Sequence, residues 1–469
     1  NKVIKIVKNK NQKIMSAAKN EDASQPGLEC AQLQEFQQFL LSTSKISNDA
    51  SSGGGSGSAS VVVTRNNNDT YTLINQELKA EIASYLFGYL GSKHIPLAFQ
   101  LGLHKLLLEQ VERYKGDLTT SGQSGADSKD AKYDLQKLQK FLLSQTEELF
   151  RKWSDNLKEA SWETYAEKSE LCLKGKKCTC LEDRGEHHVV GHIKNKPRKM
   201  EDRHVCWDNY SKLFNLPSQN YRFYAVFDGH SGSLAASYAA SQLPHLLAEQ
   251  LSSQSELDFG DSNVYRECLE AAFLLTNQGF SAKGLNSGTT AVTALLGLNS
   301  QQIPQHLFVA WVGDSKALLV SPLNHLQLVK PHKPDSMEER QRIESSGGSV
   351  IHTHGQFRVN GILNVARSIG DHSVSAVIAE PDFVDVPLNE SHDFLVLGTD
   401  GLFDHVKEQH IGDIIYGALL EGCESLEDIP KLLIEQAKQG DSQDNITVVI
   451  VFFKERSQIV KHYQDKLKS

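Results

Sequence analysis

Short apolar runs that stop beside Asp and Gly residues recur through this chain. Three of them cover residues 223–229, 308–314 and 394–401, and a fourth, 445–453, directly follows Asp444. Runs of this length that are rich in β-branched and aromatic residues predict buried strands. A strand end holds an Asp side chain rigidly, and a neighbouring Gly lets a second group come close. We therefore expect several carboxylates to converge where buried strands end.

Amphipathic patterns between these runs predict helices. They cover residues 233–252, 263–280, 335–346, 408–421 and 425–439. Regular alternation of strands and helices would suggest parallel βαβ units, but here strand-rich blocks are separated by helices in pairs. This order favours an α+β fold whose layers are mainly antiparallel sheet.

The remaining parts of the chain divide by composition. At roughly 150 residues per domain, a chain of 469 residues allows about three domains. Nine of the ten residues in SSGGGSGSAS, at positions 51–60, are Ser or Gly, which is typical of a flexible linker. We predict a disordered low-complexity segment at 1–60, a helical extension at 61–185, a catalytic domain at 186–455 and a C-terminal tail at 456–469.

The extension carries apolar residues at helical spacing. Leu86, Tyr89 and Leu90 lie three and four residues apart, and a similar pattern begins at Leu135. These spacings predict helices within 76–116 and 131–171. A helical hairpin packed on another part of the chain is the simpler interpretation, and a segment that binds a scaffold protein is the alternative.

The first residues differ in character from the rest. Residues 1–14 contain five lysines and no acid, and the first Met is Met15. We interpret residues 1–14 as translated upstream sequence or a fragment boundary, with Met15 as the natural start. A basic tail that contacts lipid or nucleic acid is the alternative.

Charge and cysteine content exclude several classes of protein. The chain has 49 Lys and Arg against 58 Asp and Glu, a net charge of −9, which argues against a nucleic-acid-binding protein. No apolar run reaches the ~20 residues of a membrane-spanning helix. Seven cysteines, an odd number, do not form a disulfide framework. A reducing compartment follows, the cytoplasm first and the nucleus second.

The acidic strand ends suggest a metal site. Mg²⁺ and Mn²⁺ prefer carboxylate, carbonyl and water oxygens, and two such ions can activate water and hold a phosphoryl group. Any one Asp is more commonly a turn residue or a helix cap. For the Asp residues taken together, the interpretation as turn residues or helix caps is weaker, because the surrounding motifs also match a known pattern.

Eight motifs in a fixed order make up that pattern. They are RKMED (198–202), VFDGHSG (226–232), SGTTA (287–291), VGDSK (312–316), HKPD (332–335), RVNGILNVARSIGD (358–371), GTDGLFD (398–404) and DSQDNITVV (441–449). Together they resemble the metal-dependent protein serine/threonine phosphatases of type 2C over residues ~186 to ~455. The sequence around RKMED and FDGH, with the helical extension, is most similar to the calcium/calmodulin-dependent protein kinase phosphatase subgroup.

The resemblance implies a fold, a metal centre and an activity. The fold is a β-sandwich of two antiparallel sheets flanked by helix pairs. The activity is hydrolysis of phosphoserine and phosphothreonine in proteins, by a hydroxide that bridges two Mg²⁺ or Mn²⁺ ions. A third, weaker ion belongs to the same pattern.

The resemblance also assigns residues. The metal ligands implied are Asp228, the Gly229 carbonyl, Asp371 and Asp444, with Glu201 and Asp202 on metal-bound waters. Asp314, together with Asp371, corresponds to the position of the third ion. His230 corresponds to the general acid that protonates the departing Ser or Thr oxygen, because an alkoxide is a poor leaving group. Asp400 corresponds to a supporting residue behind the ligands.

Four positions depart from the family pattern. The usual phosphate-binding Arg is Pro197, and Arg198 can take over that role only if the strand is bulged, because neighbouring strand residues face opposite sides. Ser231 replaces a Gly and costs stability if its φ is positive. Lys316 replaces an Arg and Pro331 an Asp, and both are interpreted as structural.

Two further hypotheses remain open in addition to the phosphatase interpretation. A pseudophosphatase that binds partners without turnover would explain the missing Arg. A zinc site would use three cysteines and three histidines, but their spacing is not a standard one; they are Cys172, Cys178, Cys180, His187, His188 and His192. Expected partners are phosphoproteins, including protein kinases, with a scaffold protein on the extension and no nucleic acid or membrane span.

Overall fold

The computed structural model describes seven stretches of the chain. They are residues 70–92, 97–120, 131–159, 187–216, 220–254, 257–423 and 425–468. The expected disordered segment at 1–60 and the three cysteines of the zinc hypothesis lie outside these stretches. The described residues up to Phe150 and those from His187 onward cluster into one compact unit.

Two five-stranded antiparallel sheets form the centre of this unit. The first has the order β15 (Asp382–Pro387), β9 (Pro304–Val312), β8 (Ala291–Leu298), β5 (Asn220–Phe227) and β4 (Arg203–Trp207). The second has the order β11 (Asn324–Gln327), β10 (Lys316–Ser321), β16 (Phe394–Gly398), β17 (Ile446–Phe452) and β3 (His188–Ile193). All neighbouring strands in both sheets are antiparallel.

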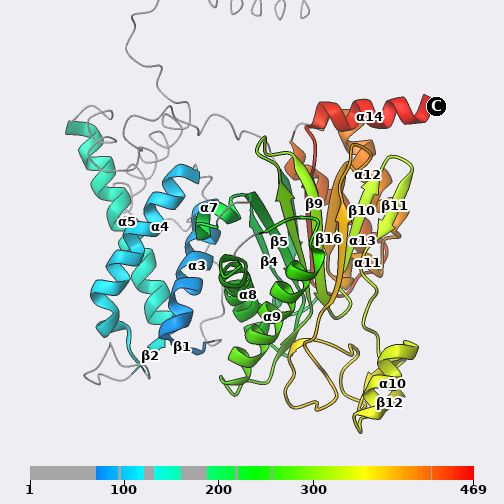
Figure 1. Cartoon of the computed structure of the whole chain (residues 1–469), viewed down its shortest axis with the longest axis horizontal. Helices are drawn as coiled ribbons and strands as arrows, with labels where there is room; N and C mark the ends of the chain where they lie inside the picture. The colour runs from blue at the N-terminus through cyan, green and yellow to red at the C-terminus, as the bar shows by residue number, and fades with distance from the viewer. Residues whose placement is uncertain are drawn as a thin grey trace, which may run out of the picture. The chain divides into compact units, whose positions relative to one another are not determined.

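The two sheets pack face to face over an apolar core. Val226 and Leu296 of the first sheet are fully buried in one cluster with Leu397 and Val449 of the second. Figure 1 shows the two sheets side by side. The predicted α+β sandwich is therefore confirmed, and the long apolar runs are strands that bury both faces.

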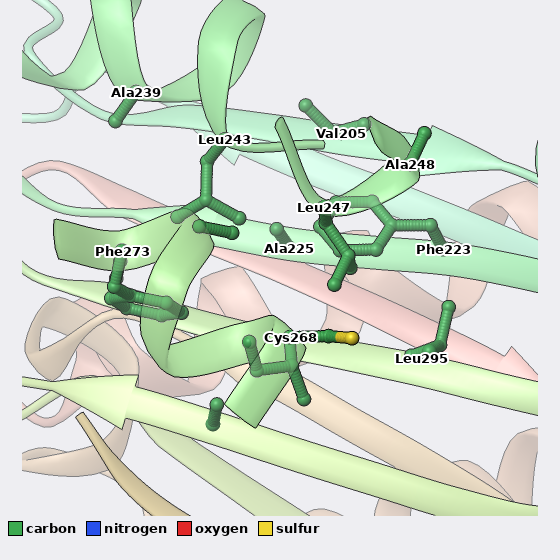
Figure 2. Packing of buried hydrophobic residues seen from close by; sticks show 14 of the residues in the cluster. Val205, Phe223, Ala225, Ala239, Leu243, Leu247, Ala248, Cys268, Phe273 and Leu295 are labelled. Carbon is green, nitrogen blue, oxygen red and sulfur yellow. The ribbon is translucent and has the colours of Figure 1, made fainter. Parts of the chain in front are cut away.

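Helix pairs cover the outer faces of the sandwich. α8 (Leu234–Ser252) and α9 (Ser262–Ser281) pack on the first sheet, and their Leu243, Leu247 and Phe273 lie in one buried cluster with Phe223 and Leu295. Figure 2 shows Leu247 against Phe223. The second sheet is covered by α11 (Asp400–Phe403), α12 (Glu408–Glu421), α13 (Ile429–Gln439) and α14 (Arg456–Lys468). The helices predicted between the strands thus all exist, with ends shifted by a few residues.

Shorter elements complete the part of the unit that begins at His187. A three-stranded sheet has the order β14 (Ile369–Gly370), β7 (Gly288–Thr289) and β6 (Gly229–His230). A lobe follows β11 and contains α10 (Met337–Ser345) and the hairpin of β12 (Val350–Thr353) and β13 (Gln356–Val359). α7 (Tyr210–Phe214) joins β4 to β5, and the short helix η4 (Leu426–Asp428) precedes α13.

The amino-terminal region has more elements than a simple hairpin. Its helices are η1 (Asn75–Glu77), α3 (Leu78–Ser92), α4 (Leu97–Tyr114), η2 (Lys115–Leu118) and α5 (Leu135–Glu159), and β1 (Thr72–Ile74) pairs with β2 (Lys132–Asp134). The range 76–116 therefore contains two long helices rather than one. Within the described residues, no helix has both the length and the apolar character that crossing a membrane requires.

The carboxyl-terminal residues are also ordered. Residues 456–468, expected as a tail, form α14, and Tyr463 stacks on Tyr416 of α12 with ring centroids 4.1 Å apart. Asp393, which is fully buried, accepts hydrogen bonds from Lys454 (2.6 Å) and Tyr416 (2.8 Å) and contacts His462 (2.8 Å). These contacts attach the last helix to the second sheet.

Candidate active site

The small three-stranded sheet joins two motifs that are distant in sequence. Gly229 and His230 of β6 pair with Thr289 and Gly288 of β7, and β7 pairs in turn with β14, which ends beside Asp371. A Cβ on Gly288 would lie 1.9 Å from Asp371 Oδ2 and 2.4 Å from His230 Nε2. Only Gly at position 288 therefore lets the two side chains meet.

His230 and Asp371 form a close polar pair in the site. Their Nε2 and Oδ2 atoms lie 2.7 Å apart, and Ser368 Oγ donates to the same oxygen at 2.6 Å. Asp371 has φ of +50° and follows Gly370, whose φ is +96°. The left-handed turn aims the carboxylate at the imidazole, at a cost in backbone strain that neighbouring contacts must offset.

Five carboxylates gather beside this pair. Burial raises the pKa of Asp228 well above its usual range, and the negative charges of four other aspartates add to the rise; these are Asp202, Asp400, Asp314 and Asp444. Burial, with the charges of Asp314, Asp404 and Asp444, also raises the pKa of Asp400 to about 8. Mutual repulsion of this kind is relieved by a bound cation.

Asp202 supplies the best test of whether metal ions fit. Its Oδ2 accepts hydrogen bonds from Thr447 (2.7 Å) and Thr399 (3.3 Å), whereas Oδ1 is buried with no hydrogen-bond partner among the described residues. Burial, with a further contribution from Asp444, raises the pKa of Asp202 to about 7. A buried oxygen without a partner, in a cluster of repelling carboxylates, fits a hard cation such as Mg²⁺ or Mn²⁺.

Glu201 and Gly229 are held next to each other. The Glu201 amide donates to Asn445 Oδ1 at 2.7 Å, and its Oε2 accepts from Gly232 N at 3.1 Å. A Cβ on Gly229 would lie 2.5 Å from the Glu201 carbonyl oxygen, so position 229 requires Gly. The two residues assigned to one metal centre by sequence are thus neighbours in space.

Asp314 has an ammonium partner that the sequence assignments did not include. Asp314 is buried, and Lys333 Nζ hydrogen-bonds its Oδ2. The charges of Asp314, Asp404 and Asp400 raise the pKa of Lys333 against the opposing effect of its burial. Lys333 lies in HKPD, so the motif itself could have pointed to it.

The structure brings most of the predicted site residues together, but in two groups. Asp202, Asp228, Asp314 and Asp444 act on one another electrostatically, together with Asp400, which sequence reasoning placed only in a supporting position. Asp371 instead contacts His230. Within the described ranges, no three or more His, Cys, Asp or Glu side chains already stand at metal-ligand spacing.

The phosphate-binding position lies outside any strand. β3 ends at Ile193 and β4 begins at Arg203, and residues 196–199 form a bend between them. Arg198 was expected to take over the role of the missing Arg only if the backbone departs from a regular strand, and the bend at 196–199 is such a departure. The Arg198 side chain is exposed.

The other departures have visible consequences. Ser231 has φ of +57°, so it occupies the strained conformation that a Gly would relieve. Lys316 Nζ lies 3.1 Å from Glu408 Oε1 and 5.6 Å from the Phe403 ring centroid, which ties β10 to α11 and α12. The Pro331 carbonyl accepts a hydrogen bond from Lys333 N at 3.0 Å.

The histidines of the zinc hypothesis have other partners. His188 Nδ1 lies 3.1 Å from Asp208, which also accepts from Tyr224 OH at 2.6 Å. His187 Nε2 lies 3.0 Å from the guanidinium of Arg222. These contacts belong to the packing of β3, β4 and β5.

Comparison with known families decides the identity of this domain. The family model described as "Protein phosphatase 2C" matches residues 186–446, more than half of the chain. The chain belongs to the protein phosphatase 2C family. The resemblance stated from the eight motifs is therefore confirmed.

Relatives from several organisms share this region. The chain is 38% identical to mouse "Protein phosphatase 1E" over 274 residues, which cover 57% of this chain and 35% of that protein. It is 38% identical to human "Protein phosphatase 1F" over 275 residues, which cover 57% of each. The matched region thus spans between about a third and three fifths of these relatives.

A solved structure matches a larger part of the chain. "Structure of a C.elegans sex determining protein" aligns with a TM-score of 0.63 at 21% identity and covers 82% of this chain and 90% of that one. The shared fold therefore extends beyond the 57% of the chain that the sequence relatives cover.

Proposed function

We propose that this protein is a metal-dependent protein serine/threonine phosphatase that hydrolyses phosphoserine and phosphothreonine. The main support is the buried carboxylate cluster with its unpartnered Asp202 oxygen, next to the His230–Asp371 pair. Membership of the protein phosphatase 2C family supports the same activity.

Two Mg²⁺ or Mn²⁺ ions, and a third weaker one, would be held by the clustered carboxylates and the Gly229 carbonyl. When bound, these ions activate water for attack and neutralise charge on the phosphoryl group. Asp228 would be the central ligand, because the charges of four neighbouring carboxylates act on it. Glu201 and Asp202 are held by Asn445, Gly232, Thr447 and Thr399, so they can position water around the ions.

His230 is the group that delivers a proton. Its Nε2 faces Asp371 at 2.7 Å, and Asp371 is itself fixed by Ser368. The carboxylate can orient the imidazole toward the leaving oxygen of Ser or Thr, which takes the proton. Arg198, exposed in the bend before β4, supplies positive charge for the substrate phosphate.

The decisive experiment measures phosphate release from a phosphothreonine peptide by the full chain, with Mn²⁺, with Mg²⁺ and with EDTA. We expect metal-dependent release that Asp228→Asn lowers by more than about 100-fold, because removal of even a supporting residue costs up to that much. Asp465→Asn, an exposed residue on α14, is the matched control and should keep full activity. Metal-independent release, or near-normal turnover by Asp228→Asn, would defeat the proposal.

The same experiment tests the pseudophosphatase alternative. Its only support is Pro197 in place of the phosphate-binding Arg, while the carboxylates and His230 are all present. No release from well-folded protein supplied with Mn²⁺ would favour partner binding without turnover.

We further propose phosphoproteins, protein kinases among them, as substrates, the cytoplasm or nucleus as location, and a scaffold protein as partner of the extension. The reducing compartment follows from the odd cysteine count, and the extension adds surface beyond the region shared with the relatives. Affinity purification of the full chain and of a variant that lacks residues 1–185 would show which partners need the extension.

A further inference from the structure

Residues 70–92, here called the amino-terminal segment, are attached to the part of the chain that begins at His187 by two buried carboxylates. Glu77 is 6% and Glu81 is 2% exposed. Glu77 accepts hydrogen bonds from Tyr238 OH of α8 and from Lys283 Nζ, just after α9, both at 2.6 Å. Glu81 accepts from Ser241 Oγ of α8 at 2.6 Å. Charged groups buried in this way are strongly disfavoured unless their partners remain in place, so the segment is fixed to both helices.

Lys283 is the centre of this attachment. Its side chain is only 7% exposed, and its ammonium also donates to the Thr72 carbonyl at 2.9 Å. It lies 5.6 Å from the ring centroid of Tyr238. A Cβ on Gly279 would lie 2.2 Å from Tyr238 OH, so α9 and α8 touch closely at this point.

The same end of α9 holds the turn that carries Asp371. Asn277 Oδ1 accepts a hydrogen bond from Gly370 N at 2.9 Å and lies 3.0 Å from His372 Nε2. The ring of Phe280 packs against the rings of Tyr238 and His372, with centroid distances of 5.6 Å and 6.2 Å. A continuous set of contacts therefore leads from Glu77 through the end of α9 to both neighbours of Asp371.

This turn needs external support because its backbone is strained. Gly370 and Asp371 have φ of +96° and +50°, and the Asp371 amide donates to the Ser287 carbonyl at 3.1 Å. Asn277 supplies a side-chain contact from a second element. A helix that shifts or frays at its end would move this acceptor and release the turn that aims Asp371 at His230.

We propose that Asn277 is a positioning residue for Asp371, and that the amino-terminal segment keeps it in place through the Glu77–Lys283 pair. The extension is thus part of the catalytic apparatus, not only a partner-binding appendage. The proposal rests on the proposed phosphatase function for its kinetic readout, but its metal-binding readout does not.

The first test substitutes Asn277 in the full chain. Asn277→Ala should weaken Mn²⁺ binding to the metal-free protein, measured by isothermal titration, by about 10- to 100-fold and lower kcat by a similar factor. Asn263→Ala, an exposed residue on the same helix, is the matched control and should change neither. Unaltered Mn²⁺ affinity in Asn277→Ala would overturn the proposal.

The second test releases the segment. Lys283→Met should raise amide hydrogen exchange across 78–92 by on the order of 100-fold, because Glu77 loses its buried counter-charge. It should also weaken Mn²⁺ binding and lower kcat by about 2- to 30-fold. Lys438→Met, which removes a lysine from an exposed ion pair with Glu435, is the control.

Charge reversal keeps the second test decisive. If Lys283→Met leaves exchange unchanged, Glu77→Lys will separate the segment by repulsion. The double variant Glu77→Lys/Lys283→Glu should then restore part of the docking and part of the Mn²⁺ affinity, because the swapped pair loses the contacts to Tyr238 and to the Thr72 carbonyl. Raised exchange with unchanged Mn²⁺ affinity and turnover would refute the coupling. If the wild-type chain itself shows no turnover, the phosphatase proposal fails. The Mn²⁺ titrations still decide whether Asn277 positions Asp371.

Discussion

His230 and Asp371 are 141 positions apart in the chain, and yet their side chains meet at 2.7 Å. The contact depends on Gly288, which leaves room for both groups. A general acid matters only when the leaving group needs a proton, which gives a direct test of His230.

We expect His230→Asn to lower kcat by about 10²- to 10⁴-fold on a phosphothreonine peptide but far less on p-nitrophenyl phosphate. The nitrophenolate ion leaves without protonation, whereas a Thr alkoxide does not. Steady-state kinetics on both substrates check this, with His410→Asn, exposed on α12, as the control. An equal loss on the two substrates would assign His230 to binding or metal positioning instead.

A second prediction at this scale concerns the phosphate contact. Pro197→Arg should lower KM for a phosphopeptide by about tenfold, because it adds a charged hydrogen bond to the substrate. Residues 196–199 form a bend, so the new side chain is not turned away by strand alternation. An unchanged KM would show that Arg198 or Lys196 already supplies the contact, and adding Arg198→Ala would identify which.

At the scale of elements, Lys316 joins strand to helix. Its ammonium lies 3.1 Å from Glu408 at the start of α12 and 5.6 Å from the Phe403 ring centroid of α11. Lys316→Met should therefore lower the free energy of unfolding by about 1 kcal/mol. The measurement is urea denaturation with Mn²⁺ present, beside the exposed control Lys461→Met. A raised KM without a loss of stability would instead place Lys316 in substrate binding.

The elements themselves were predicted unequally well. The strands 220–227 and 446–452 and the helices 234–252 and 408–421 lie close to their predicted positions, because each shows an unbroken pattern. The amino-terminal region was predicted less accurately, since periodicity marks apolar faces but not the break between α3 and α4. The bend before β4 was not predicted, although Pro197 within the polar run KNKPRK (194–199) is a local sign against a regular strand.

At the scale of the whole molecule, the carboxylate cluster sets how stability depends on pH and metal. The pKa of Asp202 is raised to about 7 and that of Asp400 to about 8, and the pKa of Asp228 is raised as well. Near neutral pH the metal-free folded protein therefore holds protons that the unfolded chain has lost. Because the folded state binds more protons, its stability falls as pH rises through this range.

We expect the Tm in EDTA to fall between about pH 6.5 and 8.5 and the stabilisation by Mn²⁺ to grow over the same interval, since ions replace the protons. Buried histidines act in the opposite direction only at lower pH, because burial lowers the pKa of His104 to about 4 and of His204 to about 3. Thermal denaturation at several pH values checks this. Asp228→Asn should flatten the dependence, and a Mn²⁺ effect that is independent of pH would contradict it.

The sequence alone determined the family and the main elements, and it predicted which residues would form a metal centre. These depend on local patterns and on eight ordered motifs, both of which are readable along the chain. The sequence could also identify His230 as the candidate general acid, because the preceding Asp228 and Gly229 identify the motif.

Only the tertiary structure decided which of these residues touch. The meeting of Asp202 with Thr447, the Lys333 contact to Asp314 and the support of Gly370 by Asn277 all join distant segments. Sheet order and helix packing create such contacts, and no local pattern encodes them. For the same reason, Glu77 looks like an ordinary helix-start residue in the sequence, but in the folded chain it attaches the extension to the catalytic domain.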